Sequence, residues 1–142
     1  MMMDMEPVGS HSFEDHTSEV AIRLRAPTLA GLFAEAGRAL AEVMNGGLPP
    51  AGAARSEPVI LASRDLDALL VDWLNLLILR SETERVLFTG FAFDEVADCQ
   101  LVATIRGAPA PSLRSIVKAA SYHGVRVARD GDGYSATVVL DV

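Results

Sequence analysis

Residues 65–80, DLDALLVDWLNLLILR, form the stretch around which the rest of the chain must pack. Its apolar residues recur at steps of three and four, which predicts a helix with one wide apolar stripe. The stripe consists of Leu66, Leu69, Leu70, Trp73, Leu74 and Leu77, and it is widened by Leu76, Ile78 and Leu79. Asp65 and Asp67 suit the start of this helix, where free N–H groups and the positive dipole end favour carboxylates, and Arg80 suits its end. We therefore expect a buried central helix that is covered on more than one side.

The chain has 142 residues, half of them apolar, and a formal net charge of −7. This length fits one domain with a single sizeable core. The acidic balance argues against direct, strong nucleic-acid binding, which needs clustered Lys and Arg. No apolar run reaches the roughly 18 residues that cross a bilayer, and the N-terminus lacks the basic start and apolar block of a signal peptide. With Cys99 as the only cysteine, we expect a soluble cytoplasmic protein without disulfides and without a membrane partner.

The first half of the chain alternates strands and helices. Residues 1–12 show no periodicity, and we expect a disordered or frayed tail there, followed by a single domain over residues 13–142. Alternation over residues 19–25 predicts a half-buried strand. Thr28 then suits the N-cap of a helix that stops at Asn45-Gly46-Gly47. A short strand at residues 58–62 precedes the central helix.

The second half indicates strands only. Residues 86–96 and 100–106 predict two long strands, and a loop follows at 107–112. Further strands are predicted at 113–121 and 125–129, interrupted near His123-Gly124, and at 134–141 after a DGDG hairpin turn at 130–133. The order is β-α-β-α followed by a run of β-strands. This order predicts an α+β fold in which two helices pack on a mixed sheet as a two-layer sandwich.

Several catalytic and binding motifs are absent from the sequence. There is no Gly-rich phosphate loop, no G-x-S-x-G elbow and no H-E-x-x-H. The twelve residues from Asp130 to Asp141 resemble a calcium loop in length only. Their fifth and sixth positions are Tyr134 and Ser135, where an EF-hand needs an oxygen ligand and then glycine. We therefore interpret the DGDG stretch as a hairpin turn, and the spacing of Ser, His and Asp indicates no triad.

Carboxylates gather before the first predicted strand and at the end of the last one. Residues 13–19, FEDHTSE, hold three carboxylates and a histidine, and the sequence ends at Asp141-Val142. If the last strand ends beside the start of the first, oxygen ligands from these two stretches converge there. Such oxygen ligands suit a hard cation such as Ca²⁺ or Mg²⁺. The alternative is an acidic, solvated loop next to an ordinary frayed terminus.

Four stretches occur in an order that is more specific than any single motif. They are DHTSEVAIRLRAPTLAGLFAEAGRALAEVM, DLDALLVDWLNLLI, VKAASYHGVRV and the terminal LDV. Together they span nearly the whole chain from Phe13 and resemble the archease family. The family pattern has an acidic residue before His-Thr-Ala-Asp, a helix opened by Thr-Leu, Asp-Leu-x-x-Leu-Leu, Val-Lys-Ala-x-Thr-Tyr-His and a terminal Asp-Ile.

The resemblance implies a protein that activates an enzyme and is not itself one. It implies promotion of the GTP-dependent guanylylation and multiple turnover of an RtcB-type RNA ligase, in tRNA splicing or RNA repair. GTP and Mn²⁺ would then belong to the partner ligase. The resemblance also implies a divalent-metal site, occupied by Ca²⁺, at Glu19, Asp141 and the terminal Val142. The positions implied to act on the partner are Lys118, Asp15, His16 and Tyr122.

The chain departs from the family pattern at a few positions. Glu19 replaces the family's Asp and is one methylene longer, in a site where ligand reach affects affinity. Ser121-Tyr122 stands for Thr-Tyr, and residues 107–115 form a shorter loop than the family's Gly-Glu-rich one, which bears on partner specificity. Two other classes remain open. One is a metal-dependent phosphoester hydrolase with His16 as base, and the other is a non-catalytic structural interaction module.

Overall fold

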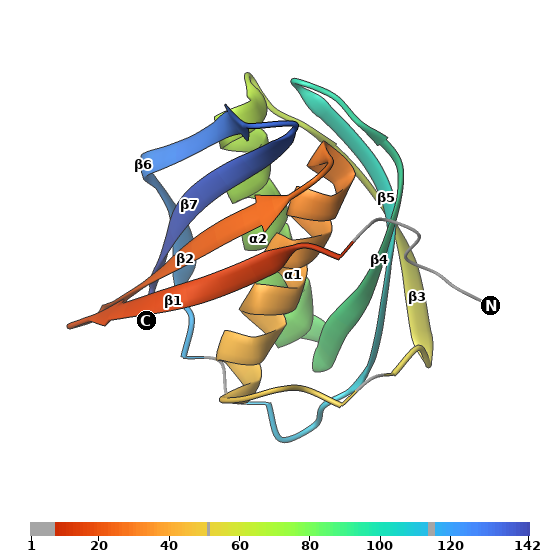
Figure 1. Cartoon of the computed structure of the whole chain (residues 1–142). Helices are drawn as coiled ribbons and strands as arrows, with labels where there is room; N and C mark the ends of the chain where they lie inside the picture. Colours follow the sequence, from red (N-terminus) through yellow and green to blue (C-terminus); the bar gives the residue numbers. More distant parts are fainter. Residues whose placement is uncertain (1–7, 51, 114–115) are drawn as a thin grey trace.

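Figure 1 shows a computed structural model of the chain, which describes residues 8–50, 52–113 and 116–142, the side chain of His16 excepted. Within these ranges the chain forms two helices and seven strands. The helices are α1 (Leu29–Asn45) and α2 (Leu66–Glu84). The strands are β1 (Ser10–His16), β2 (Glu19–Ala26), β3 (Arg55–Ala62), β4 (Val86–Val96), β5 (Gln100–Pro109), β6 (Ala119–Asp130) and β7 (Gly133–Asp141).

The described strands form two sheets, with the orders β1-β2-β7-β6 and β3-β5-β4, and every pairing is antiparallel. Both helices lie between the sheets (Figure 1), because α1 contacts β2 and β4 while α2 contacts β6, β4 and β3. The predicted α+β fold with two helices is confirmed. The single mixed sheet in two layers is wrong, because the molecule has three layers, sheet–helices–sheet.

The composition of α1 explains the third layer. Its buried residues include Ala34, Ala36, Gly37, Ala39 and Ala41, which lie around most of its circumference. A Cβ added at Gly37 would lie 2.6 Å from the ring of Phe91 on β4. These small residues allow β4 to pack closely on α1 while β2 packs on it from the other sheet. Thr28 caps the start of α1 by accepting from the Gly31 N–H at 2.9 Å, as predicted.

Helix α2 is the predicted central helix, and it carries the main aromatic contact of the core. Asp65 caps its start by accepting from the Ala68 N–H at 2.8 Å. Trp73 is fully buried, donates to the carbonyl of Phe33 at 2.9 Å, and lies against the rings of Phe91 and Phe93. The helix continues to Glu84, beyond the predicted end at Arg80, and ends at Arg85 in a left-handed conformation. The Arg80 side chain bonds to Glu57 and to the Pro58 carbonyl of β3.

Strand β1 corrects the predicted tail and acidic loop. Ser10–His16 pairs along the full length of β2, although residues 10–12 were expected to fray and an acidic loop before Glu19 was one of the two alternatives. His11, Phe13 and Asp15 face the same way as the core residues of β2. Two of these three side chains are polar, which hides the alternation of a half-buried strand. The expectation of disorder for residues 1–7 lies outside the described residues.

The C-terminal half matches the prediction in its turns better than in its strand limits. The DGDG turn connects β6 to β7, with Gly131 at φ +61°. The predicted interruption at His123-Gly124 is a bulge, since the β6–β7 register shifts between Ser121 and Arg126 and Gly124 has φ +75°. Two strand limits were wrong: β6 begins at Ala119, not at residue 113, and β5 extends through Pro109 into the predicted loop.

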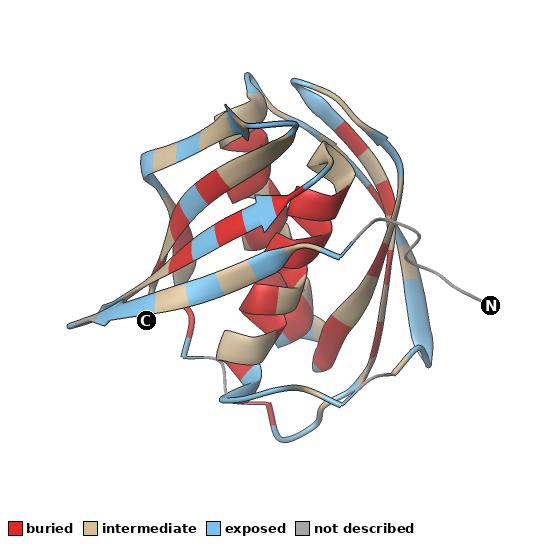
Figure 2. Ribbon diagram, in the orientation of Figure 1, coloured by how far each residue is buried: buried red, intermediate tan, exposed pale blue. Residues whose placement is uncertain are grey.

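Buried residues concentrate on the helices and alternate along the strands (Figure 2). One face of each sheet therefore packs on the helices, and the other face is open to solvent. Neither helix in the described part of the chain is long and apolar enough to cross a membrane.

Candidate functional site

One corner of the four-stranded sheet brings together two side-chain carboxylates. Glu19, the first residue of β2, pairs directly with Asp141, the last residue of β7. Residues opposite each other on neighbouring strands have their Cβ atoms about 5 Å apart and point to the same face. Together with Val142, we call Glu19 and Asp141 the carboxylate corner.

Backbone hydrogen bonds fix the end of the chain at this corner. The Val142 N–H donates to the carbonyl of Ser18 at 3.0 Å, in the tight turn between β1 and β2. Ser18 has φ +70°, a left-handed conformation that closes the turn. Figure 1 shows the C-terminus beside the free end of the β1–β2 hairpin. This bond holds Val142 next to Ser18, the residue before Glu19.

The side chains of the corner offer only oxygen atoms as ligands for a cation. Glu19 is exposed, and Asp141 and Val142 are half-buried. Neither Glu19 nor Asp141 forms an ion pair with a described residue, so two like charges face each other across the strands. No three His, Cys, Asp or Glu side chains converge among the residues that the structure describes. An ion here would need the terminal carboxylate, backbone carbonyls or water in addition to Glu19 and Asp141.

Lys118 lies next to this corner. Its N–H donates to the Asp141 carbonyl at 2.7 Å, and the following residue, Ala119, pairs with Asp141 in the sheet. The Lys118 side chain is exposed and forms no ion pair with any described residue. The lysine therefore places an unneutralised positive charge beside a pair of negative ones, at the surface.

Asp15 and His16 occupy different positions relative to the corner. Asp15 pairs with Val20, whose side chain belongs to the opposite face of the sheet from Glu19. The structure therefore does not bring the Asp15 carboxylate to the carboxylate corner. The backbone of His16 pairs with Glu19 in the same row as Asp141. The expected role of the His16 side chain lies outside the described part of the chain.

Tyr122 is held by α2 and not by the corner. Its hydroxyl donates to Asp72 Oδ1, and the other oxygen of Asp72 accepts from Ser63 Oγ at 2.5 Å. The hydrogen bond to Asp72, followed by desolvation and the charge of Asp72, raises the pKa of Tyr122 above its ordinary value of 10.0. Tyr122 is three residues from Ala119, about 10 Å along an extended strand. Sequence reasoning grouped it with the corner residues because they share a motif.

Polar residues of α2 support the backbone of β6, a role that sequence reasoning missed. Asn75 acts as a pseudo-strand residue: its Oδ1 accepts from the Ala120 N–H at 2.8 Å, and its Nδ2 donates to the Ala120 carbonyl at 3.2 Å. Asp67 Oδ1 accepts from the Val127 N–H at 2.8 Å. These side chains satisfy the outer edge of β6, which no strand covers. The interruption of an apolar helix by polar residues was the available signal.

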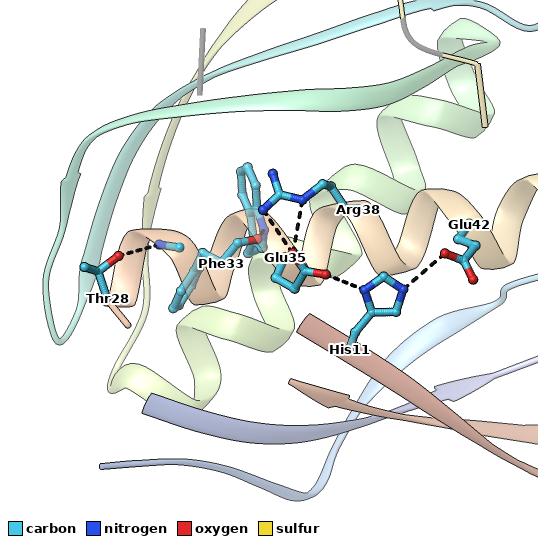
Figure 3. Close-up of polar contacts among 8 residues, drawn as sticks. His11, Thr28, Phe33, Glu35, Arg38 and Glu42 are labelled. Atoms are coloured by element: carbon cyan, nitrogen blue, oxygen red, sulfur yellow. Dashed lines mark hydrogen bonds and ion pairs between the residues drawn. The ribbon is translucent and has the colours of Figure 1, made fainter. Parts of the chain in front are cut away.

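A second missed cluster fixes β1 on α1 (Figure 3). His11 Nδ1 lies 2.5 Å from Glu35 Oε2, and Nε2 lies 3.1 Å from Glu42 Oε1. Glu35 is 5% exposed and also accepts from Arg38 at 3.0 Å. Both imidazole nitrogens therefore face carboxylate oxygens of α1. This cluster holds β1, and with it the hairpin that ends at the corner.

Known proteins resemble this chain both in sequence and in fold. The model of the Archease protein family (MTH1598/TM1083) matches residues 11–142. Protein archease of Methanosarcina barkeri is 27% identical over 141 residues, which cover 93% of this chain and 95% of that protein. Protein archease of Methanopyrus kandleri is 29% identical over 135 residues, covering 90% and 96%.

Two solved structures share the fold. The solution structure of Methanobacterium thermoautotrophicum protein 1598 has a TM-score of 0.67 at 24% identity and covers 93% of this chain and 98% of that one. The crystal structure of a Thermotoga maritima archease, described as a possible chaperone, has a TM-score of 0.66 at 20% identity and covers 91% and 94%. Since the family model covers nearly the whole described chain, from β1 to the C-terminus, this chain belongs to the archease protein family.

Proposed function

We propose that the chain is a non-catalytic activator that promotes GTP-dependent guanylylation and multiple turnover of an RtcB-type RNA ligase. Membership of the archease family supports this proposal. The description of the Thermotoga maritima relative as a possible chaperone agrees with a protein that acts on another protein. In this proposal GTP and Mn²⁺ belong to the ligase.

The observation that carries the proposal is the register at the carboxylate corner. Glu19 lies opposite Asp141, and Val142 is bonded to the turn that precedes Glu19. Two chain segments far apart in sequence thus present their polar ends at one surface point. Such a point can contact the active site of a partner without any change in the rest of the fold.

The donor set of the corner fits a hard divalent cation such as Ca²⁺. Two side-chain carboxylates and the terminal carboxylate supply oxygens, which Ca²⁺ accepts in flexible geometry and larger number than Mg²⁺. Facing carboxylates without a neutralising partner repel each other, so the corner gains from a cation. A bound ion would supply positive charge and open positions for oxygen ligands of the partner. Glu19, Asp141 and Val142 would hold it.

Lys118 supplies the second contact in this proposal. Its exposed ammonium would meet an acidic group of the ligase or of the nucleotide-linked intermediate. An activator of this kind works only by binding one conformation of the ligase more tightly than another. The corner and Lys118 would favour the conformation in which GTP is correctly placed for attack. No step of the chemistry is assigned to a residue of this chain.

The test follows covalent GMP on the cognate ligase in the presence of GTP and Mn²⁺. We expect the chain to accelerate the first guanylylation and, when RNA substrate is added in excess over the ligase as acceptor of the GMP, to sustain later turnovers. Active ligase that shows no acceleration in either phase would overturn the proposal. The chain alone should not hydrolyse a phosphoester, and metal-dependent turnover by the chain alone would overturn its non-catalytic role.

Variants locate the effect at the corner. Asp141→Asn and Glu19→Gln remove ligand charge at nearly constant volume, and we expect each to reduce stimulation by at least about tenfold, the lower range for disturbed metal sites. Lys118→Ala should reduce stimulation without changing cation binding. Asp98→Asn is the matched control, because Asp98 is an exposed carboxylate near the β4–β5 turn of the other sheet. Equal stimulation by Asp141→Asn and Asp98→Asn would show that the corner is not used.

A further inference from the structure

The outer face of the four-stranded sheet contains a hollow of about 650 Å³ that the proposed function does not use. It spans all four strands of this sheet, and Arg23, Arg25 and Arg126 line it together with Ser12, Gly124 and Thr137. We call it the arginine hollow. Its volume lies within the range of small-ligand sites, about 300–1,000 Å³.

The strand register determines which side chains border the hollow. Thr137 of β7 pairs with Arg23 of β2 on one side and with Arg126 of β6 on the other. Neighbouring strands lie about 4.8 Å apart, so the two arginines rise from backbone positions about 10 Å apart with a hydroxyl between them. Gly124, in the β6 bulge, has no side chain to fill the space beside Arg126.

The three arginines differ in how their charge is neutralised. Arg23 Nη2 lies 2.6 Å from Glu14, and Arg25 Nε lies 3.0 Å from Asp130, both at the exposed rim. Arg126 is exposed and forms no ion pair with any residue that the structure describes. The chain as a whole carries a net charge of −7. The guanidinium of Arg126 therefore makes the wall of the hollow locally positive, although the protein as a whole is negatively charged.

The lining indicates the kind of anion that fits. Planar guanidinium groups bind phosphate oxygens in a bidentate manner, and hydroxyl groups add single hydrogen bonds. No Phe, Tyr or Trp lines the hollow, so it offers no platform on which a base could stack. The acidic net charge disfavours a long polyanion, which would meet repulsion beyond the hollow. These features favour recognition of phosphate groups on a ligand of nucleotide size.

We propose that the arginine hollow binds the phosphate group of a nucleotide-sized ligand, with Arg126 and Thr137 as its principal contacts. Arg23 lies four residues from Glu19 on the same face of β2, about 13 Å along the strand. A phosphate in the hollow and a partner at the carboxylate corner would therefore contact one continuous surface. The proposal concerns the chain alone and stands whether or not the chain activates a ligase.

The test is an NMR titration of the isotope-labelled full chain at low ionic strength. The probes are inorganic pyrophosphate, GMP and a single-stranded RNA of about six nucleotides, and the comparison ligand is a glutamate peptide of similar charge. We expect saturable shifts of the Arg126, Thr137 and Ser135 amides with at least one phosphate probe, weakened by added salt. Preference for pyrophosphate, GMP or RNA would identify the phosphate source. Tighter binding of the glutamate peptide than of every phosphate probe would overturn the proposal.

Variants connect the shifts to the hollow. Arg126→Ser should weaken phosphate binding about tenfold, as expected for loss of a charge-assisted hydrogen bond. Thr137→Val, nearly equal in volume, should weaken it less and provides a second readout if Arg126→Ser folds poorly. Arg64→Ser is the matched control, because Arg64 is an exposed arginine before α2, outside the hollow. Unchanged affinity in both hollow variants, or equal losses in Arg64→Ser and Arg126→Ser, would overturn the proposal.

Discussion

The phenol of Tyr122 makes a hydrogen bond whose contribution depends on pH. Asp72 raises the pKa of Tyr122 above 10.0, so the folded state favours the protonated phenol. The stabilisation is therefore complete below the unfolded-state pKa and is lost as pH rises through the folded-state pKa. We expect Tyr122→Phe to lower the free energy of unfolding by about 1 kcal/mol at pH 7.

Urea unfolding of both proteins at neutral and strongly alkaline pH tests this expectation. The difference between wild type and Tyr122→Phe should shrink above pH 10, the ordinary pKa of tyrosine. In absorbance titrations, Asp72→Asn should shift the Tyr122 midpoint back toward its ordinary value. A stability difference that stays constant at every pH would contradict the argument.

Glu35 is a buried carboxylate that stabilises β1 through His11 and also pairs with Arg38. Its removal leaves these two groups without their buried partner, which costs more than the net value of the bonds. We expect Glu35→Ala to destabilise the protein by about 3 kcal/mol in urea unfolding. Glu82→Ala, at an exposed site on α2, should change stability by less than about 0.5 kcal/mol. Similar values for the two variants would show that the cluster does not anchor β1.

At the scale of elements, α2 takes the place of a neighbouring strand for part of β6. Asn75 satisfies both backbone groups of Ala120, two residues from Lys118. We expect Asn75→Ala to cost about 1–3 kcal/mol, because it leaves a donor and an acceptor unpaired at the sheet edge. Hydrogen exchange of the Ala120 amide should accelerate in parallel.

The control for this prediction is Asn45→Ala, whose side chain bonds only to exposed carbonyls at the end of α1. It should leave Ala120 exchange unchanged. If Asn75→Ala also leaves the Ala120 amide as protected as in the wild type, the helix does not support this edge.

Elements whose rules are local were predictable from the sequence, and those that depend on distant partners were not. Thr28, Asp65 and the DGDG turn act through residues a few positions away, so sequence alone located them. Strand β1 was missed because its inward positions include His11 and Asp15. His11 becomes compatible with the interior only through Glu35 and Glu42, which lie 24 and 31 residues away. No periodicity of residues 10–16 contains that information.

For the molecule as a whole, the sequence indicated that the central helix is covered on more than one side, but it could not indicate that a second sheet provides this cover. Alanines of α1 are compatible with a sheet on one side or on both, and only the Gly37–Phe91 contact shows which occurs. The adjacency of Glu19 and Asp141 was a conditional prediction from strand ends, and the register confirms it. The arginine hollow needed the register of three strands, because Arg23 and Arg126 are far apart in sequence.

The carboxylate corner connects the β1–β2 turn, the start of β6 and the end of β7, so a ligand there should stabilise the entire fold. Ca²⁺ at 100 times its Kd would add about 2.7 kcal/mol, which corresponds to a rise in Tm of about 5–10 °C for a chain of this size. Asp141→Asn, or residues appended after Val142, should abolish the rise, whereas Asp98→Asn should retain it. Chelation with EDTA should reverse it. Thermal unfolding followed by the fluorescence of Trp73, which is buried against α1 and β4, measures the effect. Calcium sites in proteins have Kd values up to about 1 mM, so Ca²⁺ and Mg²⁺ should be tested up to about 10 mM. An unchanged wild-type Tm over this range would show that the corner binds no cation.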